Sequence, residues 1–382
     1  MRRRGLIASL AALPFAAACA PLLQKAQTPD RAFAGPRFEG DRFVSFDGAR
    51  LGLSTWPAEG ERQPNEPRSG DLQSGDPQSR DPQFVDPWAV IVGLHGMDDY
   101  SHAFHTAAPF WARQGITTYA YDQRGFGRSP DRGVWAGDGL MTEDLRTACA
   151  VARKRHPRAI IAVAGESMGG AVAIAAFASD RPPDADRAIL LSPAVWGFSQ
   201  QPLPYSASLW VASHTLPAYV AKPPSFIARK IWASDNVREL IAMGRDPLMI
   251  FGSRFDTLYG LVALMESAWQ GVDRVRVPSV YMYGAHDQLI PPAAAISAAA
   301  RLKPPGRTLY YGRGWHLLLR DLQAPAVWRD AAAFIRDPGG AMPSGAPPMP
   351  RTVPKGPKKP DLPPGVSPDG RIHLSELGGG DL

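Results

Sequence analysis

A serine flanked by glycines is the first feature of this sequence that could do chemistry. Residues 165–169 read Gly-Glu-Ser-Met-Gly, and they follow an apolar run at 160–164. A serine hydroxyl is a poor nucleophile until a base removes its proton, so Ser167 needs a histidine and an acid that the fold brings to it. Because this short pattern arises by chance in roughly one chain in ten of this size, the surrounding elements must decide its meaning.

Short apolar runs, typical of strands covered on both faces, alternate with helical patterns along the chain. The predicted strands lie at 42–46, 51–56, 89–96, 116–122, 159–167, 188–193, 277–284 and 307–312. The predicted helices lie at 101–114, 142–155, 168–179, 292–302 and 324–335. This order predicts an α/β fold with a mostly parallel sheet, helices on both faces and a cap subdomain inserted before the final strands.

Ser167 falls at the turn from a buried strand to a helix, where the α/β-hydrolase fold places its nucleophile. A side chain at either flanking position of that tight turn would collide with the neighbouring strand or helix. We therefore expect Gly165 and Gly169 to be steric requirements. The turn also directs the N-terminus of the next helix at the serine, and this end of a helix favours developing negative charge.

The acid and then the histidine follow the nucleophile along the chain in this fold. Three histidines come after the strand at 277–284: His286, His316 and His373. His286 precedes the acid and does not fit the order, and His373 lies in a Pro/Gly-rich tail, so His316 is the predicted base. Asp287 lies on the loop after that strand and is the predicted acid, which orients His316 without taking its proton. Two other acids are available but lie in or beside the inserted segment: Asp256 and Asp273.

An acyl-enzyme also requires donors for the oxyanion. The backbone N–H of Met168, directly after the serine, is one predicted donor. The second is the N–H of Met97, on the loop after the strand at 89–96, with Gly96 shaping that loop and His95 bracing it. No cluster with metal-ligand spacing occurs in the sequence, so we expect no metal and no other cofactor.

Five motifs occur in order: LHGMDDYSHAF, YDQRGFGRS, GESMGG, YGAHDQLIP and GWH. Together they resemble the monoacylglycerol lipase and lysophospholipase branch of the serine α/β-hydrolases. The resemblance covers residues 38–336 without the segment 58–87. It implies a carboxylic ester hydrolase that forms an acyl-enzyme on Ser167 and acts on monoacylglycerol or lysophospholipid.

The segment at about 194–275 is the predicted cap, and its large apolar residues are expected over the serine. Such a pocket suits a fatty-acyl chain and discriminates weakly by chain length. Two alternatives stay open: an acyltransferase or thioesterase with the same triad, and a non-catalytic envelope lipoprotein. Epoxide hydrolase and dehalogenase chemistry would need an aspartate in place of Ser167.

The N-terminus predicts export. Residues 1–18 combine a basic start with an apolar stretch too short to span a bilayer, which is typical of a signal peptide. Three alanines precede Cys19 and resemble a bacterial lipoprotein signal, in which this cysteine carries lipid. We expect membrane anchoring through Cys19, facing the periplasm or the cell surface; a soluble secreted protein is the alternative. Cys149 then has no partner and is a predicted buried structural thiol.

Two segments are expected to be disordered because they contain few apolar residues: the insertion 58–87 and the Pro/Gly-rich tail 337–382. The rest forms one hydrolase domain, and a hydrophobic content of 45% supports a substantial core. The formal charge of +6 includes three arginines of the leader, and no charge run favours nucleic-acid binding. The expected partners are therefore a lipid or ester substrate and a membrane.

Overall fold

A nine-stranded sheet forms the centre of this computed structural model, which describes residues 21–61, 86–222, 230–354, 362–367 and 372. Residues 1–18, Cys19 and most of the insertion 58–87 lie outside the described residues. The strand order is β1-β2-β3-β5-β4-β6-β7-β10-β11. The strands are β1 (Arg37–Glu39), β2 (Arg42–Val44), β3 (Arg50–Trp56), β4 (Ala89–Leu94), β5 (Ile116–Tyr121), β6 (Ile160–Glu166), β7 (Arg187–Leu191), β10 (Ser279–Gly284) and β11 (Gly306–Tyr311).

The sheet is parallel from β5 to β11 and antiparallel at its N-terminal edge, where β1, β2 and β3 pair with one another and β3 pairs with β5. The central strands β4 and β5 are buried along their whole length. This explains why their sequences are continuously apolar or β-branched, with no polar alternation. The predicted mostly parallel sheet is confirmed.

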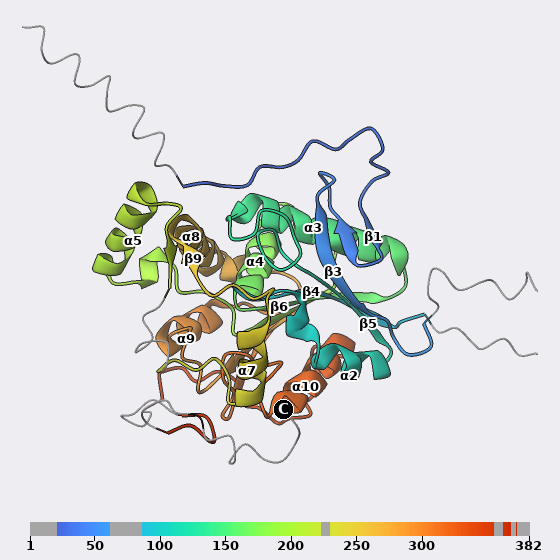
Figure 1. The fold of residues 1–382 in the computed structure, drawn as a ribbon. Helices are drawn as coiled ribbons and strands as arrows, with labels where there is room; N and C mark the ends of the chain where they lie inside the picture. Colours follow the sequence, from blue (N-terminus) through green and yellow to red (C-terminus); the bar gives the residue numbers. More distant parts are fainter. Residues whose placement is uncertain (1–20, 62–85, 223–229, 355–361, 368–371, 373–382) are drawn as a thin grey trace, which may run out of the picture.

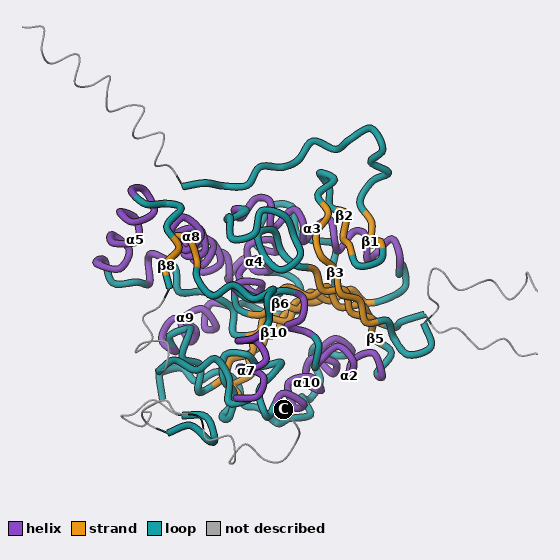
Figure 2. The backbone as a smooth tube through the Cα atoms, viewed as in Figure 1, coloured by secondary structure: helices purple, strands orange, loops and turns teal. Residues whose placement is uncertain are grey.

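Helices cover both faces of the sheet (Figures 1 and 2). One face carries α3, α4, α8 and α9, and the other carries α2 and α10. The helices are α2 (Ala107–Arg113), α3 (Gly137–Arg155), α4 (Met168–Phe177), α5 (Leu203–Thr215), α7 (Val237–Arg245), α8 (Phe255–Gly271), α9 (Pro292–Arg301) and α10 (Ala324–Arg336). Short 3-10 turns lie at Ser101–Phe104, Phe198–Gln200 and Val272–Arg274. Within the described part of the chain, no helix combines the length and hydropathy that a membrane span needs.

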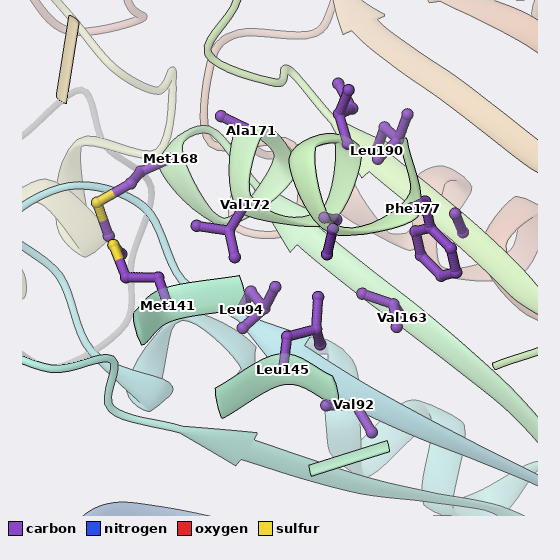
Figure 3. Close-up of a cluster of buried hydrophobic side chains, with 14 of the residues drawn as sticks. Val92, Leu94, Met141, Leu145, Val163, Met168, Ala171, Val172, Phe177 and Leu190 are labelled. Atoms are coloured by element: carbon purple, nitrogen blue, oxygen red, sulfur yellow. The ribbon is translucent and has the colours of Figure 1, made fainter. Parts of the chain in front are cut away.

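Helix α4 is buried on nearly all sides, because it lies between the sheet and two other helices. Figure 3 shows Val172 facing Leu94 of β4. It also shows Met168, at the start of α4, beside Met141, which lies in the N-terminal part of α3. Cys149 of α3 is fully buried in the same core, so the predicted burial of this thiol is confirmed. The start of α4 is therefore fixed by packing, and with it the turn that holds Ser167.

Between β7 and β10 the chain forms α5, α7, α8 and the two-stranded sheet of β8 (Val220–Ala221) and β9 (Ser253–Arg254). This is the stretch predicted as the cap. Helix α8 packs on α4, and α5 packs on α8 at the outer side of the molecule (Figure 1). The substructure is thus attached to the core through α8, and also through residues 232–237, which contact the loop after β11.

The prediction that the tail is disordered from residue 337 is wrong for residues 337–354. The backbone N–H of Tyr310 donates to the carbonyl of Pro347 at 2.7 Å, and the N–H of Met349 donates to Thr308 Oγ1 at 2.9 Å. Met342 is buried. The physical reason is that β11 is an edge strand, whose open side would otherwise be free to pair with another chain.

A buried ion cluster joins the N-terminal strands to α3. Arg124 donates to Asp47 at 2.8 and 2.9 Å and to Asp144 at 2.7 and 2.8 Å, and all three side chains are at most 2% exposed. Replacing Arg124 by Met would leave two buried carboxylates without their cation. We expect Arg124→Met to lower the free energy of unfolding by about 3–5 kcal/mol, measured by urea denaturation.

The exposed pair Arg158–Asp86 provides the matched control, since both of its side chains are mostly in solvent. Arg158→Met removes the same functional group and should leave the urea midpoint nearly unchanged. Equal small shifts for the two variants would contradict a stabilising role for the Arg124 cluster.

Candidate active site

The turn after β6 holds Ser167 in a strained backbone conformation. Its φ is 53° and its ψ is −114°, a region that a residue with a side chain rarely adopts. The serine N–H donates to the carbonyl of Leu191 on β7 at 2.9 Å, and the serine carbonyl accepts from the N–H groups of Ala171 and Ala194. These bonds hold the strained residue between β7 and the start of α4.

The glycines beside Ser167 are required by close backbone contacts. A Cβ on Gly165 would lie 2.4 Å from the carbonyl oxygen of Gly169. A Cβ on Gly169 would lie 2.3 Å from the carbonyl oxygen of Leu94. Both distances are far below van der Waals contact, so neither position accepts a side chain without moving β4 or α4.

His316 and Asp287, which the sequence pairs as base and acid, are joined by a hydrogen bond. His316 Nδ1 lies 2.8 Å from Asp287 Oδ2, and both side chains are nearly fully buried. The other carboxylate oxygen of Asp287 accepts the N–H groups of Leu289 and Ile290 at 2.8 and 2.9 Å. The acid is therefore fixed on the loop after β10, and it fixes the histidine ring on the loop after β11.

The two alternative acids lie elsewhere. Asp256 pairs with Arg254 at the start of α8, and Asp273 lies 3.5 Å from Arg301. Among the hydrogen bonds of the described residues, none joins His316 to Ser167. Catalytic hydrogen bonds of this kind often tighten only when substrate binds.

Several charges act on His316. Burial by itself would lower its pKa, but the charge and hydrogen bond of Asp287, together with Glu166 and Asp321, raise the pKa above its usual value. Since only the neutral ring can accept a proton from serine, this shift restricts the active form to higher pH.

The pH profile follows from that shift. We expect kcat/KM for an uncharged ester to rise with pH along one acidic limb, with its midpoint above about pH 6.5, the usual pKa of histidine. The measurement is initial rates at low substrate concentration from about pH 5 to pH 9. A midpoint below that of free histidine would contradict a base held between these carboxylates.

Two backbone amides lie beside the serine. The N–H of Met168 is at the first turn of α4, and the N–H of Met97 follows Gly96. Within the described chain neither amide donates a hydrogen bond to another protein group. A Cβ added to Gly96 would lie 3.3 Å from Ser167 Cβ, so the two loops approach closely here.

His95 braces the loop that carries Met97. Its Nε2 accepts the N–H of Gln123 at 2.8 Å, so its Nδ1 carries the proton and donates to the carbonyl of Gly96 at 2.7 Å. Burial lowers the pKa of His95, which keeps the ring neutral. With both nitrogens engaged, His95 has a structural role, as the sequence predicts.

The expectation that the apolar residues of the cap lie over the serine is wrong for α5. Leu203, Tyr205, Trp210 and Val211 are 51–79% exposed, so their side chains face solvent. The reason is that α5 contacts the rest of the protein mainly through α8.

A different part of the cap reaches the site. Residues 246–253 are bound to the loop of Met97: Ser253 Oγ donates to Asp98 at 2.8 Å, Ile250 N–H donates to the Asp98 carbonyl at 3.0 Å, and Tyr100 Oη donates to Asp246 at 2.7 Å.

The sequence analysis missed a buried ion cluster next to the triad. Arg320 is fully buried and donates to Asp99 at 2.6 Å and to Glu166 at 2.8 Å. Glu166 is the residue before the serine. A charged residue at the end of a strand that is otherwise buried was the available signal, since a buried carboxylate needs a cation.

The fold and the arrangement around Ser167 define a serine α/β-hydrolase. In the comparison with protein families, the model of the Hydrolase_4 family (serine aminopeptidase, S33) matches residues 85–323, and the chain belongs to this family. Within the described residues, no group of three or more His, Cys, Asp and Glu side chains could hold a metal ion.

Relatives and solved structures agree with this assignment. A monoacylglycerol lipase from Mycolicibacterium smegmatis is 28% identical over 218 residues, which are 54% of this chain and 72% of the relative. A monoglyceride lipase from Rattus norvegicus is 25% identical over 246 residues, 61% and 77% of the two chains. The fold is shared with a soluble variant of monoglyceride lipase from Saccharomyces cerevisiae, at 15% identity and a TM-score of 0.59 over 84% of this chain and 100% of that one. The chain is thus a carboxylic ester hydrolase that is similar to monoacylglycerol lipases.

Proposed function

We propose that this hydrolase cleaves long-chain acyl esters through an acyl-enzyme on Ser167. The observation that carries the proposal is the buried His316–Asp287 pair on loops at the same sheet edge as the strained serine turn. His316 takes the serine proton as Oγ attacks the acyl carbonyl, and the amides of Met97 and Met168 hold the oxyanion. The histidine then protonates the leaving alcohol, and water repeats the sequence to release the acid.

The proposed substrates are monoacylglycerols or lysophospholipids. Two relatives of this chain are named monoacylglycerol lipase and monoglyceride lipase, and these names support an ester with a glycerol-type head group. No metal or cofactor takes part in the proposed reaction, because attack, proton transfer and oxyanion binding are all assigned to protein groups.

The test is a chain-length series of p-nitrophenyl esters and 1-monoacylglycerols. We expect kcat/KM to rise from acetyl to long acyl chains, by about fourfold for each methylene that becomes buried, at about 0.8 kcal/mol per methylene. A steady fall with chain length would reject the lipid substrates. Product analysis with a competing alcohol separates hydrolysis from the alternative, acyl transfer, which would yield a new ester in place of the free acid.

We also propose that the chain is an exported lipoprotein whose cap faces the membrane. Helix α5 contains no Asp, Glu, Lys or Arg, and four of its large apolar side chains are exposed: Leu203, Tyr205, Trp210 and Val211. An exposed apolar helix surface can insert its aromatic and aliphatic side chains into the membrane, at the boundary between the lipid headgroups and the acyl chains.

The N-terminal arm supports the same orientation. The N–H of Leu22, three residues after the predicted lipid-bearing Cys19, donates to Asp256 Oδ2 at the start of α8. Leu22 and Leu23 are half-exposed. Since α8 carries α5, an anchor on Cys19 would enter the membrane on the cap side of the molecule (Figure 1).

Two variants test the membrane proposal. Cys19→Ala should release the protein from the membrane fraction and remove the lipid mass from its N-terminus; an unchanged distribution and mass would reject lipidation. Trp210→Glu should slow hydrolysis of vesicle-borne monoacylglycerol several-fold but leave a soluble short ester unaffected. Val353→Glu, at an exposed valine of the tail outside the cap and the histidine loop, is the matched control.

A further inference from the structure

Three loops of the proposed active site meet at one buried guanidinium. Arg320 lies four residues after His316, Glu166 directly precedes Ser167, and Asp99 lies two residues after Met97. A single nitrogen of Arg320, Nη2, donates to both carboxylates, at 2.8 Å to Glu166 and 2.6 Å to Asp99. None of these three side chains is more than 5% exposed.

The loss of any one charged member of this buried cluster would destabilise the folded protein. A carboxylate or guanidinium in a dry interior is strongly destabilised without a partner of opposite charge. Burial raises the pKa of Glu166, whereas the charge of Arg320 favours its ionised form. Within the described chain, the other hydrogen bond of the guanidinium is weak, at 3.6 Å from Nη1 to Met243 Sδ. The carboxylates therefore hold the guanidinium in place.

The residue after Arg320 fixes the same loop from another side. Asp321 accepts the N–H of Trp315 at 2.6 Å and the hydroxyl of Ser234 at 2.7 Å. The backbone just before His316 is thus tied to a buried carboxylate, and Arg320 is the point at which that loop joins the other two.

We propose that Arg320 is a positioning residue for the ester hydrolysis proposed above: by bridging Glu166 and Asp99, it holds the histidine loop against the serine turn and the oxyanion loop. The second part of the proposal is electrostatic. Glu166 directly precedes Ser167 and is bonded to Arg320 on the histidine loop, so its buried negative charge favours the protonated form of His316 and helps to set the pH range of the reaction.

The charges that face His316 come from three elements. Asp287 approaches from the loop after β10, Glu166 from the end of β6, and Asp321 from the loop of His316 itself. Arg320, on the same loop, is the cation among them. Asp99 contacts Arg320 but is not among the leading influences on the histidine. Glu166 and Asp99 therefore share a partner and differ in their effect on the base.

That difference supplies a matched pair of variants. Glu166→Gln and Asp99→Asn each remove one anion from Arg320 with little change in shape. We expect Glu166→Gln to move the acidic midpoint of kcat/KM to lower pH by about 0.5–1 unit, whereas Asp99→Asn leaves it in place. Coincident midpoints for Glu166→Gln and wild type would overturn the electrostatic part.

Replacement of Arg320 tests the positioning part. One nitrogen of Arg320 makes both contacts, and the single ammonium group of a lysine could make them too. Arg320→Lys should therefore keep kcat/KM within about tenfold of wild type. Arg320→Met should instead lose about 10²–10³-fold in kcat with little change in KM. The triple variant Arg320→Met/Glu166→Gln/Asp99→Asn removes the unpaired charges, so it should fold and still show the loss in kcat. Wild-type activity in Arg320→Met or in the triple variant would overturn positioning.

Labelling with a fluorophosphonate distinguishes failure of this inference from failure of the proposed function. If wild type hydrolyses esters and is labelled at Ser167 but the Arg320 and Glu166 variants match it, only the inference is overturned. If wild type neither reacts with the probe nor hydrolyses any ester of the series, the proposed function fails and the inference fails with it.

Discussion

Ser167→Ala is expected to lower kcat/KM for the best ester of the series by about 10⁴–10⁶-fold. The substitution removes the only atom proposed to form a bond to the acyl group, and it leaves the oxyanion amides and the binding pocket in place. Those remaining groups would account for residual hydrolysis above the rate in water. The measurement is steady-state kinetics together with the mass of the protein after treatment with a fluorophosphonate.

The loss should not come from unfolding. The alanine of the variant would occupy the same strained backbone as Ser167, and the backbone bonds to Leu191, Ala171 and Ala194 do not involve the side chain. The urea midpoint of the variant should therefore match that of wild type. Ser208→Ala, on the exposed side of α5, is the matched control and should retain full activity and full labelling. Probe attached to the Ser167→Ala protein would place the nucleophile elsewhere.

The sequence predicts the elements around Ser167 because their causes are local. An unbroken apolar strand, a glycine on either side of the serine and a helix of small residues follow one another within twenty residues at 160–179. The contacts that exclude a Cβ at Gly165 and Gly169 are made by that same turn and by β4. Asp287 and His316 are predictable for a related reason, since loops that follow parallel strands at the same ends converge on one edge of the sheet.

The Arg320 cluster depends on contacts that no local pattern encodes. Glu166 and Arg320 are separated by 154 residues, and Asp99 and Arg320 by 221. Glu166 stands at the end of an otherwise apolar strand, which could have indicated a buried carboxylate that needs a cation, but several arginines could have met that need. Only the three-dimensional arrangement selects Arg320.

Helix α5 and the tail deviate from the predictions for physical reasons of their own. The apolar residues of α5 are compatible with a helix buried in the protein and with a helix that lies at a membrane surface. Composition alone does not tell whether protein or lipid covers these residues. In the tail, proline and glycine predict irregular backbone, which the structure has at 338–354. Irregular backbone is nevertheless ordered here, since it covers the edge strand β11 and buries Met342.

Asp287→Asn is expected to lower kcat by about 10⁴-fold while leaving the fold intact. In the structure one carboxylate oxygen accepts the N–H groups of Leu289 and Ile290, and the other accepts His316 Nδ1. An asparagine would keep its oxygen on the two amides and turn its NH₂ group toward the histidine. His316 Nδ1 must then accept a hydrogen bond, so the proton moves to Nε2.

That tautomer is wrong for catalysis, because a protonated Nε2 cannot take the proton of Ser167. The variant should consequently react slowly with fluorophosphonate as well as with esters, since both reactions require activation of the serine. Asp273→Asn, at the alternative acid beside Arg301, is the matched control and should retain wild-type kcat. If Asp287→Asn lost less than tenfold in kcat while Asp273→Asn or Asp256→Asn lost several orders of magnitude, the acid would be misassigned and the orientation of His316 would need another source.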